Sequence, residues 1–571
     1  MKSKVSLGIL GGGPSALFMY KRLVDAELHH FDVTIYEKSP CLGCGMPYSA
    51  SGAEDEHITN VSANEIPDLV TSISEWIDTV PSSILNRYNI DPERFNDYKV
   101  LPRLLFGEYL KDQFELLRQK AKLKGLNTTI YYNSSIDDVV DLPEGKKVEV
   151  VLTNGKKYIH DRVVICTGHL WPKKFEGKVE GWFDSPYPPD KLAIECNYTV
   201  AVRGSSLTAI DAIRTLSKHN GVFERGTDGK LVYTANKSSE QFKISMMSRN
   251  GLLPAVRFHL EDSHLGKGTI LSAEQIEENK ALNNGFLSLD YVFEHNFKEL
   301  IRKQDPIYYE KIRDLNMEGF VEYVMEIREK LDPFILLKAE YREAEKSIQR
   351  RTSIYWKELL AVLSFTINYP AKYFSAEDTI RMQKVLMPLI SIVIAFVPQS
   401  SAETLMALYD AGRLEVIAVG DNSEVNPGED KGAVYSYVDK DGINQEKYFE
   451  LFVDCIGQPH LAYEEIPYQS LLANQTFSKA LIRFRDQELG KKMHLNNEKN
   501  IHRGLDNCYY LTVPGVAIND YFQALDAFNV ANDRIYVMAV PFIGGFNPDY
   551  SGLDFCEAAS AKIMKTLSIP Q

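Results

Sequence analysis

The chain has 571 residues, of which 44% are hydrophobic and 25% charged, a composition typical of a globular protein with several domains. The net charge of −14 argues against a general nucleic-acid-binding protein, which normally presents a basic face. The longest apolar run, Val385 to Val397, contains Pro388 and is too short to cross a bilayer, so we expect no membrane segment. The seven scattered cysteines indicate reduced thiols in a cytoplasmic protein, and the histidines show no metal-ligand spacing.

The first elements predict a βαβ unit with a glycine-rich turn. The apolar run Val5 to Leu10 predicts a buried strand, and Gly11 to Gly13 form a tight turn into a helix from Pro14 to Leu23. A second strand, Val33 to Tyr36, ends in Glu37. A glycine triplet alone is weak evidence, but a triplet between a strand and a helix, with an acid after the next strand, indicates a dinucleotide site.

Each position of this G-x-G-x-x-A fingerprint has a physical role. Gly11 lets the backbone reverse, and Gly13 lets it approach a pyrophosphate because no Cβ intervenes. Ala16 keeps the helix close to the strand, and the unpaired N–H groups of the first helical turn face the phosphates. The Glu37 carboxylate is placed to accept hydrogen bonds from a ribose diol. The candidate cofactor-binding residues here are Gly11, Gly13, Pro14, Ser15, Ala16 and Glu37.

Cys41 and Cys44 follow in a C-x-x-C spacing with two open interpretations. A pair near a βαβ unit can be a redox couple, as in flavin disulfide reductases. The neighbouring Gly43 and Gly45 favour the simpler interpretation, in which small residues fit a tight loop beside the cofactor.

The region between the two predicted nucleotide sites contains a helix and a small β unit. An amphipathic helix begins near Leu101 and contains Arg103 at its start, where a cation does not stabilise the helix dipole. Arg103 therefore either uses its charge elsewhere or is a solvated surface residue. Segments 129–132 and 148–152, with the residues around Tyr158, predict an antiparallel unit with a hairpin turn at 154–155. A buried strand then ends in Thr167-Gly168, whose small side chains allow close passage over a cofactor.

A second strand–turn–helix begins at Thr199. Gly204 to Asp211 lie where a second dinucleotide fingerprint belongs, although Ser206 occupies a usual glycine position. Its Cβ restricts the approach of a pyrophosphate, while its hydroxyl can still donate a hydrogen bond. Arg249 follows the partner strand 242–248, where it either grips an NADP 2′-phosphate or caps a loop.

The remaining chain predicts a helical insertion and a return to both sheets. Residues 261–395 carry apolar positions at helical spacing. Strands follow at 414–419, 434–438 and 449–455, and another at 534–540. A loop with Asp549 precedes a closing helix from about Asp554 to Leu567. This order is similar to that of two-dinucleotide flavoproteins, in which such a loop and the amino end of such a helix meet the flavin.

With these motifs in place, the chain resembles the FAD-NAD(P)-binding flavoproteins related to amine N-hydroxylating flavin monooxygenases, which include L-aspartate N-hydroxylases. The matching segments cover most of the chain and are 11–16, 43–49, 57–61, 102–109, 166–168, 204–208 and 248–254. The resemblance implies an α/β fold of two dinucleotide-binding Rossmann-like domains, as in two-dinucleotide-binding flavoproteins, with an all-helical insertion. We expect an FAD-binding domain at 1–170, completed by 500–571. An NAD(P)-binding domain is expected at 190–260, completed by 396–460, with the helical insertion at 261–395.

The resemblance also implies FAD and NAD(P)H as cofactors, and a small-molecule substrate and molecular oxygen as partners. The expected reaction is monooxygenation, in which a flavin hydroperoxide N-hydroxylates an amine or amino acid; the chain is a possible homo-oligomer. An NAD(P)H oxidoreductase without oxygen insertion and a non-catalytic flavin-binding scaffold stay open as alternatives. No catalytic side chain is identified, because the cofactor carries such chemistry. The further candidate cofactor-binding residues are Asn60, Arg103, Thr167, Gly168, Gly204, Ser205, Thr208, Arg249 and Asp549.

Overall fold

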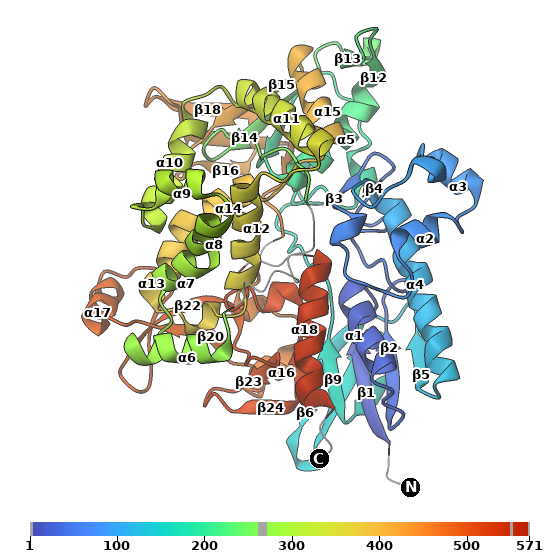
Figure 1. Ribbon diagram of the computed structural model, residues 1–571, viewed down its shortest axis with the longest axis vertical. Coiled ribbons are helices and arrows are strands. Elements are labelled where there is room, and N and C mark those ends of the chain that lie inside the picture. Colours follow the sequence, from blue (N-terminus) through green and yellow to red (C-terminus); the bar gives the residue numbers. More distant parts are fainter. Residues whose placement is uncertain (1–3, 261–270, 459, 549–551, 569–571) are drawn as a thin grey trace.

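The computed structural model describes residues 4–260, 271–458, 460–548 and 552–568. It confirms the predicted fold class, because it contains a first sheet that is parallel except for its edge strand, a second parallel sheet and a helical region beside them (Figure 1). Asp549 lies outside the described residues. Among the described residues, no helix combines the length and the apolar character needed to cross a membrane.

The first sheet has the strand order β23-β24-β9-β1-β2-β5. Strand β1 pairs in parallel with β2 and β9, so Leu10 lies beside both Tyr36 and Ile165, and the three strands end at one edge. The strands are β1 (Val5–Leu10), β2 (Phe31–Tyr36), β5 (Asn127–Tyr131), β9 (Arg162–Ile165), β23 (Gln523–Leu525) and β24 (Ala531–Val537). Helices α1 (Pro14–Asp25), α4 (Arg103–Leu123) and α18 (Gly552–Leu567) belong to this unit.

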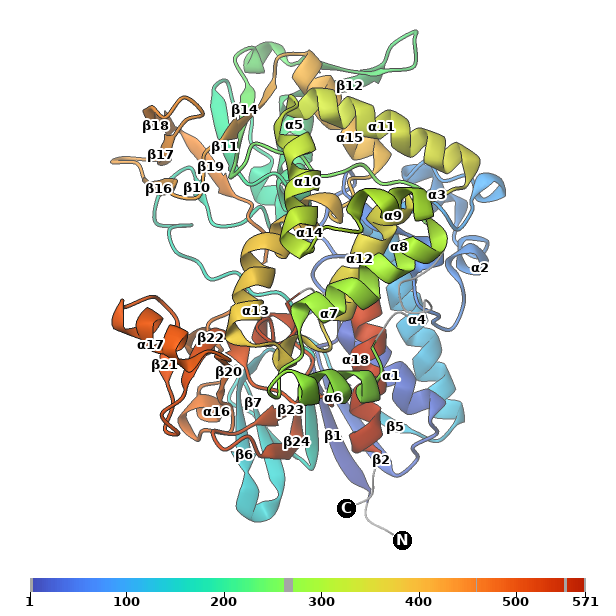
Figure 2. The ribbon, with the colours of Figure 1, turned by 60° about the vertical axis from the view of Figure 1, so that its left-hand side comes forward.

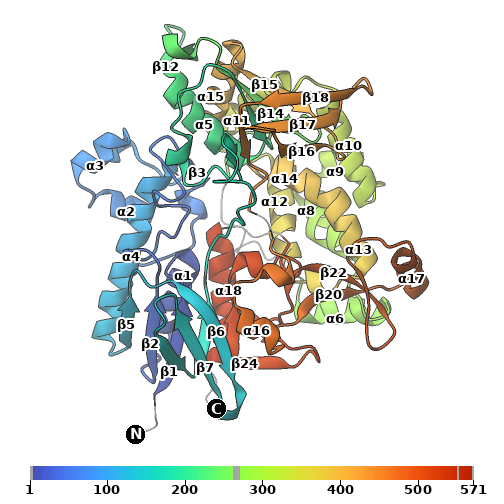
Figure 3. The same ribbon diagram turned by 180° about the vertical axis from the view of Figure 1, so that it is seen from behind.

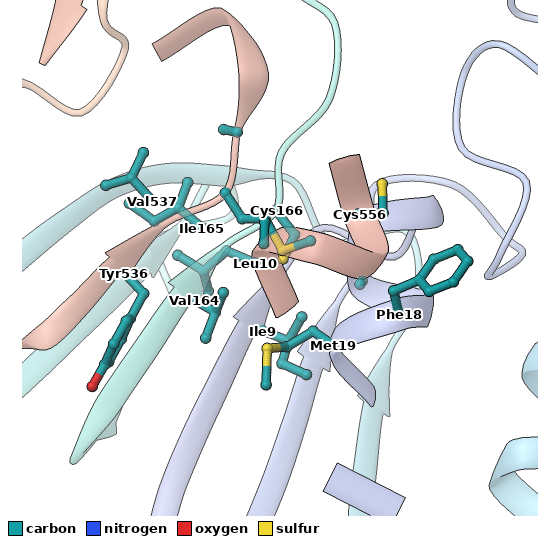
Figure 4. Close-up of a cluster of buried hydrophobic side chains, with 14 of the residues drawn as sticks. Ile9, Leu10, Phe18, Met19, Val164, Ile165, Cys166, Tyr536, Val537 and Cys556 are labelled. Carbon is teal, nitrogen blue, oxygen red and sulfur yellow. The ribbon is translucent and has the colours of Figure 1, made fainter. Parts of the chain in front are cut away.

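The core of the first unit lies between this sheet and the helices α1 and α18. Ile9, Val164 and Val537, from three adjacent strands, are fully buried, as are Phe18 and Met19 of α1 (Figure 4). Burying each such side chain contributes about 1.5–3 kcal/mol relative to exposure. The packing of α18 on α1 explains why the end of the chain is part of the first unit.

One predicted strand belongs to a different sheet. Segment 129–132 was expected in an antiparallel unit, but β5 pairs in parallel with β2, because α4 makes the crossover between them. The antiparallel unit instead consists of β6 (Ile136–Leu142), β7 (Lys147–Leu152) and β8 (Lys157–His160), seen from behind in Figure 3. β6 was missed because its sequence IDDVVDL is rich in acids and buries only Val139 fully.

The second sheet repeats the central order of the first, as β10-β19-β11-β14-β15. β11 pairs in parallel with β14 and β19, as β1 does with β2 and β9. The elements are β10 (Trp182–Phe183), β11 (Thr199–Arg203), β14 (Lys243–Ser248), β15 (Leu414–Ala418), β19 (Leu451–Asp454), α5 (Leu207–Asn220) and α15 (Gln399–Asp410). Antiparallel strands beside it are β12 (Gly221–Arg225), β13 (Leu231–Ala235), β16 (Glu424–Pro427), β17 (Ala433–Val438) and β18 (Asn444–Phe449).

The helical region has its own apolar core and contacts both units (Figure 2). Arg328 donates to the carbonyl of Leu253 on the side of the second unit, and Lys372 pairs with Asp520 of the first at 2.5 Å. Its helices are α6 (Ala273–Leu282), α7 (Leu289–Phe293), α8 (Glu299–Gln304), α9 (Pro306–Ile312), α10 (Met317–Glu329), α11 (Pro333–Arg350), α12 (Tyr355–Ile367), α13 (Ala376–Arg381) and α14 (Met387–Val393).

Shorter elements complete the fold. β3 (Ile58–Ser62) and β4 (Val100–Pro102) form an antiparallel pair that precedes α4. Near them lie α2 (Ile73–Ile77) and α3 (Ser82–Arg87). Towards the end of the chain are α16 (Gln469–Ala473), β20 (Lys479–Arg483), α17 (Gln487–Leu495), β21 (Ile501–Arg503) and β22 (Tyr509–Val516).

Candidate functional site

The first fingerprint turn requires glycine at Gly11. Its φ is +106°, a conformation that residues with a side chain rarely adopt. A Cβ there would lie 2.7 Å from the carbonyl oxygen of Cys166, and the Gly11 N–H donates to the carbonyl of Tyr36 at 2.8 Å. The turn therefore lies at the carboxyl edge of β1, β2 and β9, where ligands bind in open α/β sheets.

The amino end of α1 is arranged for an anion. Gly13 is its N-cap, Pro14 occupies the first turn, and that turn carries no acidic side chain. The first N–H groups of a helix have no partner within the helix and carry its positive dipole end. The Ser15 hydroxyl lies 3.5 Å from the Cys556 sulfur, and Ala16 is fully buried against the sheet. These residues fit the pyrophosphate of a dinucleotide.

Glu37 is fixed beneath the same turn. One carboxylate oxygen accepts from the Gly12 N–H at 2.6 Å and the other from the Ser39 N–H at 2.7 Å. Its exposure is 7%, so the carboxylate is oriented by backbone donors before any ligand binds. Each oxygen keeps a second lone pair that can accept from a ribose hydroxyl.

The second fingerprint reproduces this geometry. Gly204 has a φ of +108°, and a Cβ there would lie 2.8 Å from the carbonyl oxygen of Cys455. Ser206 is the N-cap of α5 with φ −87° and ψ −169°, close to the −81° and −163° of Gly13. A negative φ suits any residue, so Ser206 occupies the glycine position without backbone strain.

A cavity of about 390 Å³ lies at this second turn. The Ser205 hydroxyl is 3.1 Å from that of Ser248, at the end of the neighbouring strand. The Arg249 side chain is exposed on the cavity wall, with its Nε 3.6 Å from the Asp421 carboxylate. The space around Gly457 is open except for the Thr208 hydroxyl, 4.0 Å from where a Cβ would be. Gly204, Ser205, Thr208 and Arg249 thus gather around one turn.

The other candidate residues of the first unit are more dispersed. Thr167 and Gly168 follow β9, and the space where a Gly168 side chain would lie is open. The Tyr468 hydroxyl donates to that of Thr167 at 3.5 Å. The Asn60 carbonyl accepts a hydrogen bond from the guanidinium of Arg257.

Arg103 has its charge engaged within the protein. Its Nη1 donates to the Asp211 carboxylate at 2.5 Å, and its Nε donates to the carbonyl of Ile58 at 3.1 Å. The Arg103 and Asp211 side chains are 14% and 7% exposed. The pair joins α4 of the first unit to α5 of the second.

Sequence reasoning missed the residues around this pair. Tyr187 donates to the Asp211 carboxylate at 2.6 Å, and the His57 Nε2 lies 3.2 Å from the Asp211 carbonyl. Burial lowers the pKa of His57, and its Nδ1 accepts from the Glu54 N–H, so the neutral ring carries its proton on Nε2. One signal was available in the sequence: Asp211 is an acid among the apolar neighbours Ala209, Ile210, Ala212 and Ile213.

The two cysteines of the C-x-x-C spacing are in contact as thiols, with their sulfur atoms 3.4 Å apart. Burial, together with the adjacent Cys41, raises the pKa of the Cys44 thiol to about 12. A thiol with such a pKa is a poor nucleophile near neutral pH. The loop also packs on the first fingerprint, since the Gly43 N–H donates to the carbonyl of Gly12 at 2.7 Å.

Comparisons with solved structures find an N-hydroxylase and monooxygenases. The chain is 11% identical to the ornithine N-hydroxylase KtzI of Kutzneria sp. 744, with a TM-score of 0.47 and 99% of both chains covered. It is 11% identical to the cadaverine monooxygenase DfoA of Erwinia amylovora, with a TM-score of 0.45, covering 99% of this chain and 95% of that one. The chain is 11% identical to cyclohexanone monooxygenase from Rhodococcus sp. Phi1, with a TM-score of 0.43, covering 100% of this chain and 85% of that one. With TM-scores below 0.5, the fold assignment rests on the chain's own two sheets.

Comparisons with sequences and family models are more direct. The chain is 26% identical over 476 residues to the uncharacterized protein YdhS of Escherichia coli K12, covering 81% of this chain and 85% of YdhS. Residues 8–170 match the FAD-NAD(P)-binding family model, and residues 272–394 match the model of the YdhS-like middle domain. These matches confirm the predicted FAD-NAD(P)-binding domain, and with it FAD and NAD(P)H as cofactors, and they identify residues 272–394 as a YdhS-like middle domain.

Proposed function

We propose that the chain is an NAD(P)H-dependent FAD monooxygenase that N-hydroxylates the amine of a small molecule or amino acid. The observation that carries the proposal is the repeated turn geometry: Gly11 and Gly204 share a φ near +107°, and each abuts the backbone carbonyl after the neighbouring strand. Two uncapped helix ends, each at the carboxyl edge of a parallel sheet, suit two dinucleotides. Oxygen insertion into an amine is supported by the resemblance of the motif segments.

The two sites are proposed to hold different nucleotides. In the first, Gly13 and the amino end of α1 receive the FAD pyrophosphate, and Glu37 accepts from the ribose. In the second, Arg249 follows β14 where Glu37 follows β2. A carboxylate at this position would repel the 2′-phosphate of NADPH, whereas the Arg249 guanidinium can pair with it. The arrangement therefore favours NADPH over NADH. The predicted domain boundaries, 1–170, 190–260 and 261–395 with their later completions, are part of the same proposal.

The protein's own task is to bind and orient. Bound FAD supplies the redox chemistry and the activation of oxygen. The residues of the two turns hold and orient the nucleotides. This division explains why the proposal assigns no acid–base pair to the reaction.

The test uses purified protein loaded with FAD. The flavin absorbance is followed under anaerobic conditions after addition of NADPH or NADH, and isotopically labelled oxygen is then admitted with L-aspartate, L-lysine, L-ornithine or a diamine. We expect rapid bleaching by NADPH and a hydroxylamine that carries the label. Bleaching followed by oxygen consumption without a labelled product would support an oxidoreductase without oxygen insertion. Absence of bleaching with either nucleotide would leave a flavin-binding scaffold.

A further inference from the structure

A buried cluster of polar side chains joins the two dinucleotide units. At its centre is the Asp211 carboxylate on α5, whose Oδ2 accepts from Arg103 at 2.5 Å and from Tyr187 at 2.6 Å. Arg103 belongs to the first unit, whereas Tyr187 lies between β10 and β11 of the second sheet and orients the Asp211 carboxylate from within the second unit. Burial raises the pKa of Tyr187 above its usual range, so the hydroxyl stays protonated and donates.

The cluster is anchored on the first unit at several points. The Arg103 N–H donates to the His57 carbonyl at 2.9 Å, and its Nε donates to the Ile58 carbonyl. The His57 ring is fully buried, and its protonated Nε2 lies within hydrogen-bonding distance of the Asp211 carbonyl and of the Thr215 hydroxyl, at 3.2 and 3.1 Å. The Arg103 guanidinium is therefore oriented by the backbone of β3, and the His57 imidazole is oriented by acceptors on α5.

A second contact lies one turn further along α5. The Thr215 hydroxyl donates to Glu56 at 2.8 Å, and Lys218 pairs with the other oxygen of Glu56 at the same distance. Asp211, Thr215 and Lys218 are spaced four and three residues apart, so they share one face of the helix. This face of α5 is turned towards residues 54–58 and Arg103 of the first unit.

Asp211 lies close to the amino end of α5, so the cluster also affects the position of the second nucleotide turn. Asp211 lies five residues after the N-cap Ser206, which at 1.5 Å per residue is about 7.5 Å along the helix axis. The amino end of the same helix is the turn proposed to bind NAD(P)H. A contact that fixes α5 against β3 and α4 thus fixes the second nucleotide site relative to the first.

We propose that Arg103, Asp211 and Tyr187 are positioning residues that hold the NAD(P)-binding unit at the separation needed for hydride transfer to FAD. This inference rests on the proposed function. The residues touch neither nucleotide in this role, and they act through the placement of α5. Arg103 thereby receives a role different from the cofactor contact expected from its sequence position.

The principal variant is Asp211→Asn, which keeps the shape of the side chain and its bond from Tyr187 but removes the charge that faces Arg103. Asp228→Asn is the matched control, because Asp228 is an exposed acid on the β12–β13 hairpin of the same unit. FAD content and reduction of FAD by dithionite are expected to stay at the level of the control. Reduction by saturating NADPH is expected to fall about 10- to 100-fold, since small displacements of reacting groups have effects of this size.

Hydrogen exchange on the protein without cofactors supplies an independent readout. We expect faster exchange in α5 and in residues 54–61 for Asp211→Asn and unchanged rates for Asp228→Asn. Equal NADPH reduction and equal exchange in both variants would overturn the inference. If the unmodified protein is not reduced by NADPH or NADH, the proposed function fails, while the exchange arm still decides whether the cluster holds the units together.

Tyr187→Phe covers the case in which Asp211→Asn does not fold, because it removes one hydrogen bond and leaves the ion pair. The expected changes are in the same direction and smaller. A Tyr187→Phe protein with the NADPH reduction rate and exchange of the control would contradict the role assigned to Tyr187.

Discussion

The substitution Gly13→Ala separates the binding of FAD from the stability of the fold. It adds a methyl group at the N-cap of α1, where φ is −81° and ψ is −163°, a conformation that alanine adopts without strain. The nearest protein atom to the new Cβ would be the Gly45 Cα at 3.3 Å, so a shift of a few tenths of an ångström accommodates it. The same methyl group would occupy the space in which a pyrophosphate meets the helix.

The expected magnitude follows from the bonds that the methyl group prevents. A hydrogen bond from a backbone N–H to a charged phosphate contributes about 1.5–3 kcal/mol. Loss of one such bond raises the dissociation constant of FAD by roughly 10- to 150-fold, at 1.4 kcal/mol for each factor of ten. The change from glycine to alanine at an N-cap costs the helix itself less, about 1 kcal/mol or below.

The assay is a titration of FAD-free protein with FAD, followed by flavin fluorescence, together with the thermal unfolding of the FAD-free protein. Gly11→Ala is the informative contrast, because its φ of +106° and the 2.7 Å approach to Cys166 should destabilise the FAD-free protein as well. Gly145→Ala is the neutral control, since the nearest atom to its Cβ would be 3.9 Å away. Binding of FAD to Gly13→Ala with the affinity of the unmodified protein would show that the pyrophosphate does not lie on this turn.

Three further outcomes are expected. Arg249→Ala should raise the KM for NADPH about 10-fold and leave the KM for NADH unchanged, because one charge-assisted contact is lost at an exposed site. Equal effects on both nucleotides in steady-state kinetics would contradict the 2′-phosphate contact. Cys44→Ser should keep the rate of FAD reduction by NADPH within about twofold of the rate in the unmodified protein, because the Cys44 thiol with a pKa of about 12 is a poor nucleophile. Loss of turnover with FAD still bound would instead support a redox role for Cys41 and Cys44. Burial lowers the pKa of His160 from 6.5 to about 4, so the unfolded chain takes up this proton at higher pH than the folded one, and stability is lost as the pH falls below 6.5. Between pH 6.5 and pH 5 the loss is about 1.6 kcal/mol. Urea unfolding of His160→Gln should lack this loss, whereas His30→Gln, a variant of the exposed His30, should retain it.

The nucleotide turns could be predicted from the sequence because their determinants are local. A glycine that must adopt a positive φ, such as Gly11 or Gly204, lies within a few residues of the strand and helix that it joins. The order of strand, turn and helix then places the turn at the carboxyl edge of the sheet. Ser206 looked like a defect in the pattern, but its backbone angles match those of Gly13.

Long-range pairings could not be read in the same way. The assignment of β5 depends on its partner β2, with Asp32 beside Asn127, and no local pattern specifies that neighbour. The ion pair between Arg103 and Asp211 joins residues 108 positions apart, so its existence follows from the docking of two units. The unfavourable position of Arg103 at the start of a helix did indicate a charge used elsewhere, without naming its partner.

The helical region leaves and re-enters the second unit at one point. Val256 and Val397 form a bridge between parallel segments, and the Val397 N–H donates to the Ala255 carbonyl at 2.9 Å. The chain on either side of the detour is therefore already in contact, and a short linker could close it without moving a strand of the sheet. Such a junction allows the whole helical region to be removed or exchanged while the strands of the second sheet stay in place, so the region can change independently of the two nucleotide-binding units.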